Sequence, residues 1–435
     1  MARLNECILY RNFEHGEILD KMAELMNAWE KKAPDLKEKE GLFFECANGL
    51  VETAGAYGFS GNLWHCYLTF LLVNNENAFS TACEIRGAVN GSINELALND
   101  FGVFKELYDF DLTVLDEAFG ISCCKVLGDY TNTGSNSKMF NSRIRDRICD
   151  LSKTLAAAES TEEFMKDMVQ FYKDFGVGKL GLHKAFRVGH DENDNVEIQP
   201  ITRIAHVKLE DLVGYEIPKQ KLIENTEAFV RGRKANNCLL FGDAGTGKSS
   251  SIKGILNRYY DEGLRIIEVY KHQFQDLNDV IAQIKNRNYK FIIYMDDLSF
   301  EEFEIEYKYL KAVIEGGLEK KPDNILIYAT SNRRHLVREK SSDKLEIMDD
   351  YDLHSSDTVQ EKLSLVYRFG VRIYYGAPSK KEFQTIVKAL AERNGITMPE
   401  DELLLEANKW ELSHGGLTGR TAQQFIDHLL GVEKE

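Results

Sequence analysis

One short segment of the chain has the residue types and the spacing of a phosphate-binding loop. Gly242–Ser249 reads Gly-Asp-Ala-Gly-Thr-Gly-Lys-Ser and fills every fixed position of the pattern G-x-x-x-x-G-K-[ST]. In such a loop, backbone N–H groups surround phosphate oxygens, and the following helix adds the positive end of its dipole. Lys248 would reach the β- and γ-phosphates, and the Ser249 hydroxyl would bind Mg²⁺. The predicted nucleotide contacts are Gly242, Asp243, Ala244, Gly245, Thr246, Gly247, Lys248, Ser249 and Ser250.

The residues on both sides of this loop predict the context that the motif requires. Asn237–Phe241 is an apolar stretch that suits a buried parallel strand, and Ser250–Tyr260 carries apolar residues at helical spacing. Strand, glycine-rich turn and helix is the arrangement in which this motif binds nucleotides. The alternative is a chance glycine-rich turn, which the complete motif in this context disfavours.

A pair of acids follows a second apolar strand, Lys290–Met295. Because parallel sheets bind their ligands at the carboxyl ends of the strands, Asp296 and Asp297 are expected beside the loop. We predict that Asp296 binds Mg²⁺, directly or through water, and that Asp297 polarises an attacking water molecule. The alternative is a strand that ends in a solvated acidic turn. Glu301 and Glu302 follow closely and are interpreted as a solvated helix start.

Three further polar residues suit a catalytic role at the same site. Asn332 follows a third apolar strand, Asn324–Ala329, and could hold the water molecule or the γ-phosphate. Arg368 precedes a predicted strand, and Arg420 begins the last predicted helix. Each also has a simpler interpretation: Asn332 could cap a loop, Arg368 could be a surface cation, and Arg420 could pair with an acid.

Taken together, these spacings resemble the AAA+ ATPase superfamily. The match begins at Leu209–Tyr215 and continues through the loop, Asp296-Asp297, Ala329–Asn332 and Arg368–Gly370 to Arg420. More closely, the chain resembles an uncharacterised family of bacterial predicted ATPases, a domain-of-unknown-function family, over roughly its C-terminal half. The stretches that carry this closer match are Glu224–Thr226, Gly245–Ser250, Asp296–Glu301, Ala329–Leu336 and Glu361–Leu365.

The resemblance implies ATP and Mg²⁺ as cofactors and assigns three roles. Asn332 takes the sensor-1 role, Arg420 the sensor-2 role at a small helical lid, and Arg368 is similar to the arginine finger that completes a neighbouring subunit's site. A homo-oligomer follows from that finger. Most members carry Asp-Glu at the second strand end, whereas this chain has the shorter Asp297, so the resemblance supports nucleotide binding more firmly than efficient turnover.

Two functions of different classes agree with these residues. The first is an ATPase that hydrolyses ATP to ADP and phosphate and thereby drives a conformational change in an unidentified protein partner. The alternative is a nucleotide-controlled loader or adaptor that hydrolyses ATP weakly, which Asp297 in place of glutamate favours. A small-molecule kinase is disfavoured because the sequence offers no acceptor site.

Composition limits the partners and the compartment. Lys and Arg number 54 against 70 Asp and Glu, and the resulting net charge of −16 disfavours a broad nucleic-acid surface while allowing a local basic patch. The apolar run Leu63–Val73 is too short to span a bilayer and is interpreted as a buried helix. The first residues lack the apolar core of a signal peptide, so we expect a cytoplasmic protein without a membrane segment.

The cysteines do not form a metal-binding pattern. Seven of the 8 cysteines precede residue 150, and no two are spaced as Cys-x-x-Cys. Cys123 and Cys124 are adjacent, which suits neither a tetrahedral metal site nor an ordinary disulfide. We therefore predict free, buried thiols.

The predicted fold class is α/β: a parallel-sheet, P-loop core of the AAA+ kind, a C-terminal helical lid and a mostly helical N-terminal domain. The N-terminal domain, 1–175, offers no readable chemistry and is the candidate for partner recognition. A linker is predicted at 176–203, the core at 204–378 and the lid at 379–435. The predicted core strands are Cys238–Phe241, Arg265–Tyr270, Lys290–Met295, Asn324–Ala329 and Val371–Tyr375.

Overall fold

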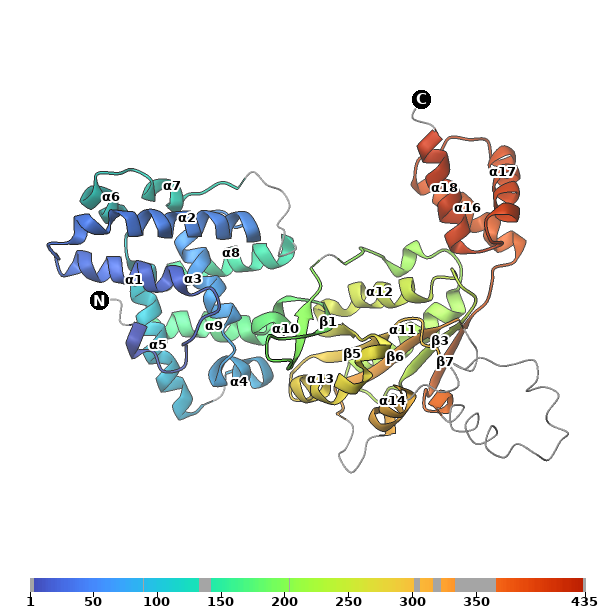
Figure 1. Cartoon of the computed structure of the whole chain (residues 1–435), viewed down its shortest axis with the longest axis horizontal. Coiled ribbons are helices and arrows are strands. Elements are labelled where there is room, and N and C mark those ends of the chain that lie inside the picture. The colour runs from blue at the N-terminus through green and yellow to red at the C-terminus, as the bar shows by residue number, and fades with distance from the viewer. Residues whose placement is uncertain are drawn as a thin grey trace. The chain divides into compact units, whose positions relative to one another are not determined.

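The chain folds into two compact units, Met1–His183 and Lys184–Glu435. A computed structural model describes residues 4–88, 90–132, 142–202, 204–300, 306–315, 322–332 and 365–432 (Figure 1). The charged segment 337–360, which we predicted to be a long surface loop, lies outside the described residues. The prediction of an α/β core with a mostly helical N-terminal part is confirmed.

Unit 1 is built from helices around one very apolar helix. Trp64, Cys66 and every residue from Tyr67 to Val73 are buried in α3, because this helix is hydrophobic on all sides and other helices surround it. The buried-helix interpretation of Leu63–Val73 is thus confirmed. The helices of this unit are α1 (Glu17–Glu30), α2 (Glu40–Tyr57), α3 (Leu63–Asn74), α4 (Ala78–Arg86), α5 (Ser92–Asp109), α6 (Thr113–Phe119), α7 (Cys124–Gly128), α8 (Ser142–Ala157), α9 (Thr161–Phe175) and α10 (Gly178–Leu182).

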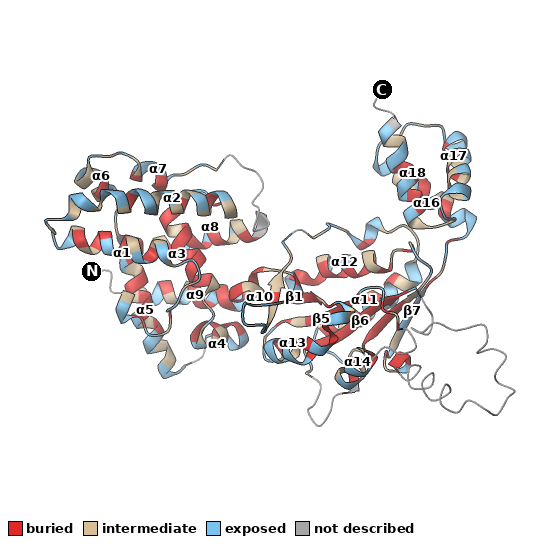
Figure 2. Ribbon diagram, viewed as in Figure 1, coloured by how far each residue is buried: buried red, intermediate tan, exposed pale blue. Residues whose placement is uncertain are grey.

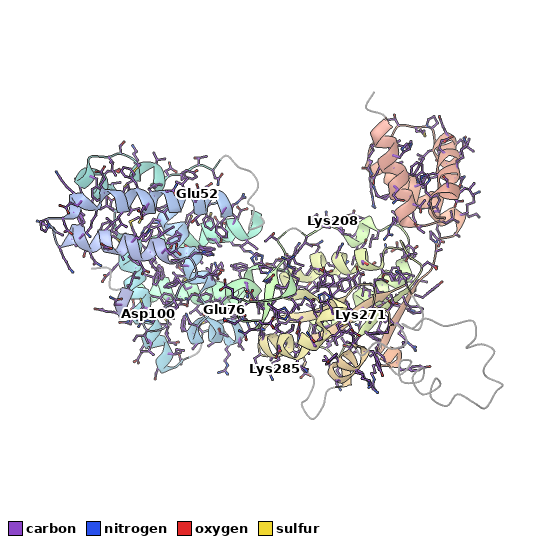
Figure 3. All side chains as sticks on the ribbon, viewed as in Figure 1. Glu52, Glu76, Asp100, Lys208, Lys271 and Lys285 are labelled. Atoms are coloured by element: carbon purple, nitrogen blue, oxygen red, sulfur yellow. The ribbon has the colours of Figure 1, made fainter. Side chains whose placement is uncertain are left out.

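A buried carboxylate fixes the N-terminal segment of unit 1. Asp100 on α5 (Figure 3) is fully buried, and its oxygens accept hydrogen bonds from the backbone N–H groups of Ile8, Leu9 and Tyr10 at 2.7–2.9 Å. A buried carboxylate is tolerated only with such donors, so these bonds both satisfy Asp100 and hold the segment against α5.

The sheet of unit 2 places the predicted motif strands side by side. Among the described residues its strand order is β2-β1-β4-β5-β6-β3-β7, and every pair except β1 with β2 is parallel. Figure 2 shows β5 and β6 buried, as expected for central parallel strands with helices on both faces. The strands are β1 (Ala185–His190), β2 (Val196–Pro200), β3 (Cys238–Gly242), β4 (Leu264–Glu268), β5 (Lys290–Met295), β6 (Ile325–Ser331) and β7 (Val371–Tyr375).

Helices cover both faces of this sheet and supply the parts of the site. α11 (Glu216–Val230) and α12 (Lys248–Tyr259) lie on one face, and α13 (Leu277–Ile284) and α14 (Glu306–Glu315) lie on the other (Figure 1). The phosphate-binding loop joins β3 to α12, so the predicted strand–loop–helix context is confirmed.

The predicted linker at 176–203 is wrong in most of its length. Residues 185–200 form the hairpin β1–β2, and β1 extends the sheet by pairing with β4. The polar run between these strands is the exposed turn that we predicted, with Asp191 Oδ1 accepting from the N–H groups of Asn193 and Asn195. The expected flexible joint at 176–181 is also wrong, because Gly178 and Gly181 are buried in α10.

The last helices form a small bundle with its own core. α16 (Lys380–Arg393), α17 (Glu400–Ser413) and α18 (Gly419–Val432) pack around Phe383, Val387 and Ile426, which are fully buried. The Arg393 guanidinium on α16 donates to the backbone carbonyls of Asp211 and Glu210, which precede α11. These bonds tie the bundle to the segment that leads into the core.

Candidate functional site

Glycines shape the phosphate-binding loop. Gly242, Gly245 and Gly247 have φ angles of +135°, +74° and +89°, a region that disfavours residues with a Cβ atom. At Gly242 a Cβ would also lie 2.1 Å from the carbonyl oxygen of Tyr375 on β7. The close approach of β7 therefore requires glycine at the first position of the motif.

Lys248 is held inside this loop. Its side chain is almost fully buried, and Nζ donates to the carbonyl oxygens of Gly242 at 3.0 Å and Asp243 at 2.5 Å. Burial lowers the pKa of Lys248 below its ordinary value, although the negative charges of Asp243, Asp297 and Asp296 oppose the shift. The ammonium is thus positioned by backbone groups and surrounded by acids at the end of the sheet.

Three elements meet at the Asp296 carboxylate. Ser249 Oγ at the start of α12 donates to Asp296 Oδ1 at 2.8 Å, and Thr330 Oγ1 on β6 donates to the same oxygen. Burial by itself would raise the pKa of Asp296, but the hydrogen bonds from the Thr330 and Ser249 hydroxyls, together with the nearby Tyr294 hydroxyl, outweigh it, so the pKa lies below its ordinary value. Asp296 is therefore a carboxylate at neutral pH, beside the hydroxyl predicted to share its metal ion.

Asp297 is oriented by two residues of the neighbouring strand. The side-chain amide of Asn332 donates to Asp297 Oδ1 at 2.8 Å, and the Asp297 N–H donates to Thr330 Oγ1 at 3.0 Å. The backbone at Asp297 has φ +50°, a left-handed conformation that aspartate tolerates better than most residues. The turn after β5 thus presents the Asp297 carboxylate beside Asn332.

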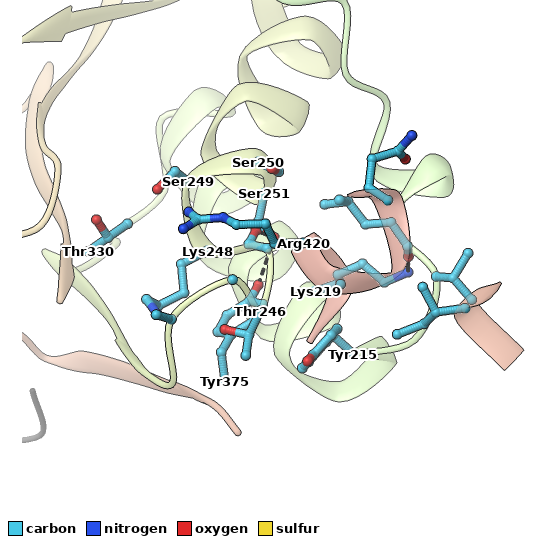
Figure 4. A pocket seen from close by; sticks show the side chains of 18 of the residues that line it. Tyr215, Lys219, Thr246, Lys248, Ser249, Ser250, Ser251, Thr330, Tyr375 and Arg420 are labelled. Atoms are coloured by element: carbon cyan, nitrogen blue, oxygen red, sulfur yellow. Dashed lines mark hydrogen bonds between the residues drawn. The ribbon is translucent and has the colours of Figure 1, made fainter. Parts of the chain in front are cut away.

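The lid contributes a cation to the same place. Arg420 at the start of α18 donates its backbone N–H to the carbonyl oxygen of Gly245 at 3.2 Å, and its side chain extends over the loop toward Ser249 and Lys248 (Figure 4). The positive charge of Arg420 is one of the influences that lower the pKa of Lys248, after burial itself. The lid and the loop therefore meet directly.

A second contact links the loop to the connection that leads into the lid. Asp243 Oδ2 accepts a hydrogen bond of 2.7 Å from the N–H of Ala377, between β7 and α16. Tyr215 OH donates to the carbonyl oxygen of the adjacent Gly376 at 3.1 Å. The connection from β7 to the lid helix α16 is therefore hydrogen-bonded directly to the phosphate-binding loop.

Most of these groups surround one cavity of roughly 610 Å³. Ala244–Ser250 line it together with Asp296, Asp297, Asn332 and Arg420. Gly242 and Asp243, the other predicted contacts, do not line it but bind Lys248 through their carbonyl groups. The tertiary structure thus brings the strand ends and the lid residue to one place.

The other end of the cavity was not predicted. It is lined by Leu212 and Val213, which precede α11, and by Ile386 and Leu390 of the lid helix α16. Lys219 of α11 lies here too, with Nζ donating to the carbonyl oxygen of Leu212 at 2.7 Å. The cavity therefore has a polar end that suits phosphates and an apolar end that suits a flat, weakly polar group.

Three residues of this site illustrate what sequence reasoning overlooked. Thr330 binds both Asp296 and the backbone of Asp297, and its signal was available as the polar residue two positions before Asn332. Leu212 and Val213 lie in Leu209–Tyr215, a segment recognised only through its resemblance, without a role.

Arg368 does not line the cavity. It is half-buried and lies directly before Phe369, Gly370 and the edge strand β7. Within the described residues, the structure thus brings Asp297, Asn332 and Arg420 together and leaves Arg368 away from them.

The described part of the chain also limits two other classes of site. No group of three or more His, Cys, Asp or Glu side chains in it could hold a metal ion. In the same described part of the chain, no helix is both long enough and apolar enough to cross a membrane. A metal ion bound by Asp296 would therefore need further ligands that are neither acids nor histidines. The Ser249 hydroxyl, phosphate oxygens and water molecules could supply them.

Comparisons with known proteins identify a family for the second unit. The family described as "Protein of unknown function (DUF815)" matches residues 182–433. No curated protein matches the chain. Among solved structures, the chain is similar to the RuvB Holliday junction branch migration motor of Thermotoga maritima, with a TM-score of 0.37 and 17% identity over 52% of this chain and 66% of that chain. Two substituted forms of that motor give the same TM-score of 0.37, at 18% and 17% identity, over 52% of this chain and 66% and 67% of theirs.

Proposed function

The chain belongs to the DUF815 protein family, and we propose that it is a magnesium-dependent ATPase of the AAA+ kind. It would hydrolyse ATP to ADP and phosphate and couple that reaction to a movement of its lid. The observation that carries the proposal is the meeting of Lys248, Ser249, Asp296 and Asp297 in one cavity, because these are the groups that bind phosphates, a magnesium ion and an attacking water molecule.

The polar end of the cavity fits a triphosphate. The glycines give the loop a backbone that can place N–H groups around phosphate oxygens, and the N-terminus of α12 adds a positive dipole. Lys248 already lies within the loop, so its ammonium needs only to exchange two carbonyl partners for phosphate oxygens. The apolar end, with Leu212 and Ile386, would receive the base and ribose.

Magnesium would be held by Ser249 and by Asp296, directly or through water, and would neutralise charge on the phosphates. The donor set supports this assignment, since a hydroxyl and an ionised carboxylate share a hydrogen bond of 2.8 Å at the loop. Thr330 fixes the orientation of that carboxylate from β6. The low pKa of Asp296 keeps the group charged at neutral pH.

Asp297 would polarise the water molecule that attacks the γ-phosphate. Its carboxylate is held by Asn332, and this bond restricts the carboxylate to one orientation at the cavity wall. Arg420 would place positive charge over the phosphates as negative charge develops on the transferred group.

Lid movement would follow from the contacts of the loop. Arg420 N–H and Ala377 N–H both bond to loop residues, at Gly245 and Asp243. A ligand that shifts the loop must change these bonds, and the lid would move in response. Unit 1 would then transmit the movement to a protein partner that it recognises.

Arg368 supports assembly into a homo-oligomer. It lies outside its own cavity and next to the edge strand β7, a position from which it could complete the site of a neighbouring subunit. We assign the protein to the cytoplasm, and its net charge of −16 makes nucleic acid a poor general partner.

A second function is favoured by one observation. Asp297 is one methylene shorter than glutamate, and Asn332 already occupies one of its oxygens. A nucleotide-controlled loader or adaptor with weak hydrolysis would suit this arrangement. Measuring phosphate release with and without candidate partners distinguishes an ATPase from a weakly hydrolysing adaptor. Candidate partners can be captured with a variant that binds ATP without hydrolysing it.

ATP binding and turnover test the main proposal directly. Lys248→Ala should abolish tight ATP binding in calorimetry, whereas Lys253→Ala, which removes an exposed lysine from the same helix, should leave binding unchanged. Asp296→Asn should bind ATP but lose magnesium-dependent phosphate release. Unchanged ATP affinity in Lys248→Ala would refute the assignment of the cavity.

A further inference from the structure

Unit 1 contains two thiols that lie within contact distance although they are far apart in the sequence. Cys66 on α3 and Cys149 on α8 are both free, and their Sγ atoms are 4.0 Å apart, with Cys66 donating to Cys149. α3 and α8 pack directly against each other. The pair is therefore brought together by the tertiary structure and not by a local motif.

The two thiols differ in exposure and in the direction of their pKa shifts. Cys66 is buried, whereas Cys149 is half-buried. The hydrogen bond from Cys66 lowers the pKa of Cys149 below its ordinary value, against the effect of burial. The positive charge of Arg145 adds to this, and the negative charge of its ion-pair partner Asp146 opposes it. Cys149 is consequently the better nucleophile of the two at neutral pH, and Cys66 is the adjacent thiol with which it could form a disulfide.

A cavity of roughly 380 Å³ lies beside the pair. It is lined by Ser60 and Ser152, and both residues also contact the Cys66 thiol: Sγ lies 3.6 Å from the Ser60 carbonyl oxygen and 3.5 Å from Ser152 Oγ. The rest of the lining mixes polar and apolar groups and consists of Gly61, Asn62, His65, Lys153, Ala156 and Ala157. Neither cysteine lines the cavity itself, but Ser60 and Ser152 separate it from Cys66 by one residue, and the half-buried Cys149 is the thiol that a small reagent reaches first.

We propose that Cys66 and Cys149 form a peroxide-reactive dithiol that closes reversibly to a disulfide. The Cys149 thiolate attacks one oxygen of hydrogen peroxide, the O–O bond breaks, and Cys149 becomes a sulfenic acid while the other oxygen leaves as water after protonation. The Cys66 sulfur then attacks the Cys149 sulfur, the S–O bond breaks, and a second water molecule leaves. Two thiols are oxidised by two electrons in total, and one peroxide is reduced to two water molecules.

The closure requires a small displacement. The sulfur atoms must approach from 4.0 Å to a bonding distance of about 2.05 Å, which side-chain rotation and a slight adjustment between α3 and α8 would supply. The bond would covalently join α3, the central helix of the unit, to α8. Among the described residues, this unit contributes none to the lining of the nucleotide cavity.

Cys123 provides a matched control, because it is the other half-buried cysteine of the chain. Burial and the charge of Asp116 raise the pKa of Cys123, so its thiol is less ionised than that of Cys149. Cys124 follows it directly in the sequence, which disfavours an ordinary disulfide between the two.

To test this, the full-length protein is treated with substoichiometric and then equimolar hydrogen peroxide. The remaining free thiols are trapped with an alkylating reagent, and disulfide-linked peptides are identified by mass spectrometry without reduction. We expect two of the 8 thiols to be lost, one Cys66–Cys149 linkage, and full recovery of both thiols with dithiothreitol. Cys149→Ser and Cys66→Ser should abolish the linkage, and Cys123→Ser should retain it.

The measurement on the unsubstituted protein does not depend on whether a variant folds. A linkage that joins other cysteines, or oxidation of Cys123 at the same rate as Cys149, would overturn the proposal. Loss of the Cys149 thiol to an acid that dithiothreitol cannot reduce, with no linkage to Cys66, would overturn it as well. None of these outcomes depends on ATP, so the result is independent of the proposed ATPase function.

Discussion

The side-chain amide of Asn332, at the end of β6, donates a hydrogen bond of 2.8 Å to the carboxylate of Asp297, which follows β5. These residues are 35 positions apart and meet because β5 and β6 are parallel neighbours whose carboxyl ends share one edge. The bond connects the group proposed to hold the attacking water with the group that resembles sensor 1. Catalysis and the sensing of the γ-phosphate are therefore expected to depend on each other.

The first prediction concerns this pair. Asp297→Asn should retain ATP binding and lower phosphate release by about 10²-fold, because the amide is a poor base. Asn332→Ala should lower the rate by roughly tenfold, since the carboxylate loses the bond that orients it. Single-turnover hydrolysis measures both. Combining the substitutions should cost little more than Asp297→Asn alone; two fully additive effects would show that Asn332 acts independently of Asp297.

The second prediction explains why aspartate stands at position 297. Its φ of +50° is better tolerated by aspartate and asparagine than by glutamate. Asp297→Glu should therefore lower the free energy of unfolding by about 1 kcal/mol, whereas Asp297→Asn should leave the backbone unstrained. Chemical denaturation of both variants provides the comparison. Equal stability of Asp297→Glu and the parent protein would contradict a conformational reason for the aspartate.

The third prediction is a pH dependence. Burial lowers the pKa of Lys248 below 10.5, so the lysine becomes neutral at a lower pH than an exposed one. Because the cation is proposed to bind the phosphates, ATP affinity should be full at neutral pH and should fall as the pH rises through the lowered pKa. Calorimetry from neutral pH to about pH 10 measures this, and Lys248→Arg supplies the control because arginine stays charged over this range. An identical pH profile for both proteins would assign the titration to another group.

The fourth prediction concerns the bond between the loop and the connection to the lid. Asp243→Ala removes the acceptor for Ala377 N–H, so amide hydrogen exchange at residues 376–379 should accelerate by about fivefold or more, as expected for a lost bond of about 1 kcal/mol. Asp243→Asn keeps a side-chain oxygen and should restore the slow exchange. ATP affinity should change little, because Lys248 is bonded by the main-chain carbonyl of residue 243. Slow exchange in Asp243→Ala would mean that other contacts hold the connection.

The fifth prediction concerns assembly. If Arg368 completes a neighbouring site, Arg368→Ala should lower the hydrolysis rate by about 10³-fold while sparing ATP binding. Mixed with Lys248→Ala subunits, it should regain activity, because some interfaces then contain both Lys248 and Arg368. Phosphate release from co-assembled subunits is the measurement. A strictly monomeric protein in the presence of ATP, or no rescue in proven mixed assemblies, would exclude a role in trans.

Much of the core was predictable because its signals are local. The loop motif, the apolar strands and the acids that follow Lys290–Met295 are each encoded within a few residues, and β5 and β7 begin and end where predicted. The rule that parallel strands present their carboxyl ends at one edge then placed Asp296, Asp297 and Asn332 together. No comparable local signal marked β1 and β2, whose short strands surround a polar turn and acquire their place by pairing with β4.

The sequence alone thus determined the chemistry that is available: a phosphate-binding loop, strand-end acids, an arginine on the last helix and free thiols in the N-terminal half. Only the tertiary structure decided which of these groups meet. Thr330 contacts Asp296 across two strands, Ile386 reaches the cavity from the lid, and Cys66 lies 4.0 Å from Cys149 across two helices. Such contacts depend on the strand order, on helix packing and on the path of the chain from the sheet to the lid. These features result from the simultaneous burial of many side chains, so a local sequence pattern does not reveal them.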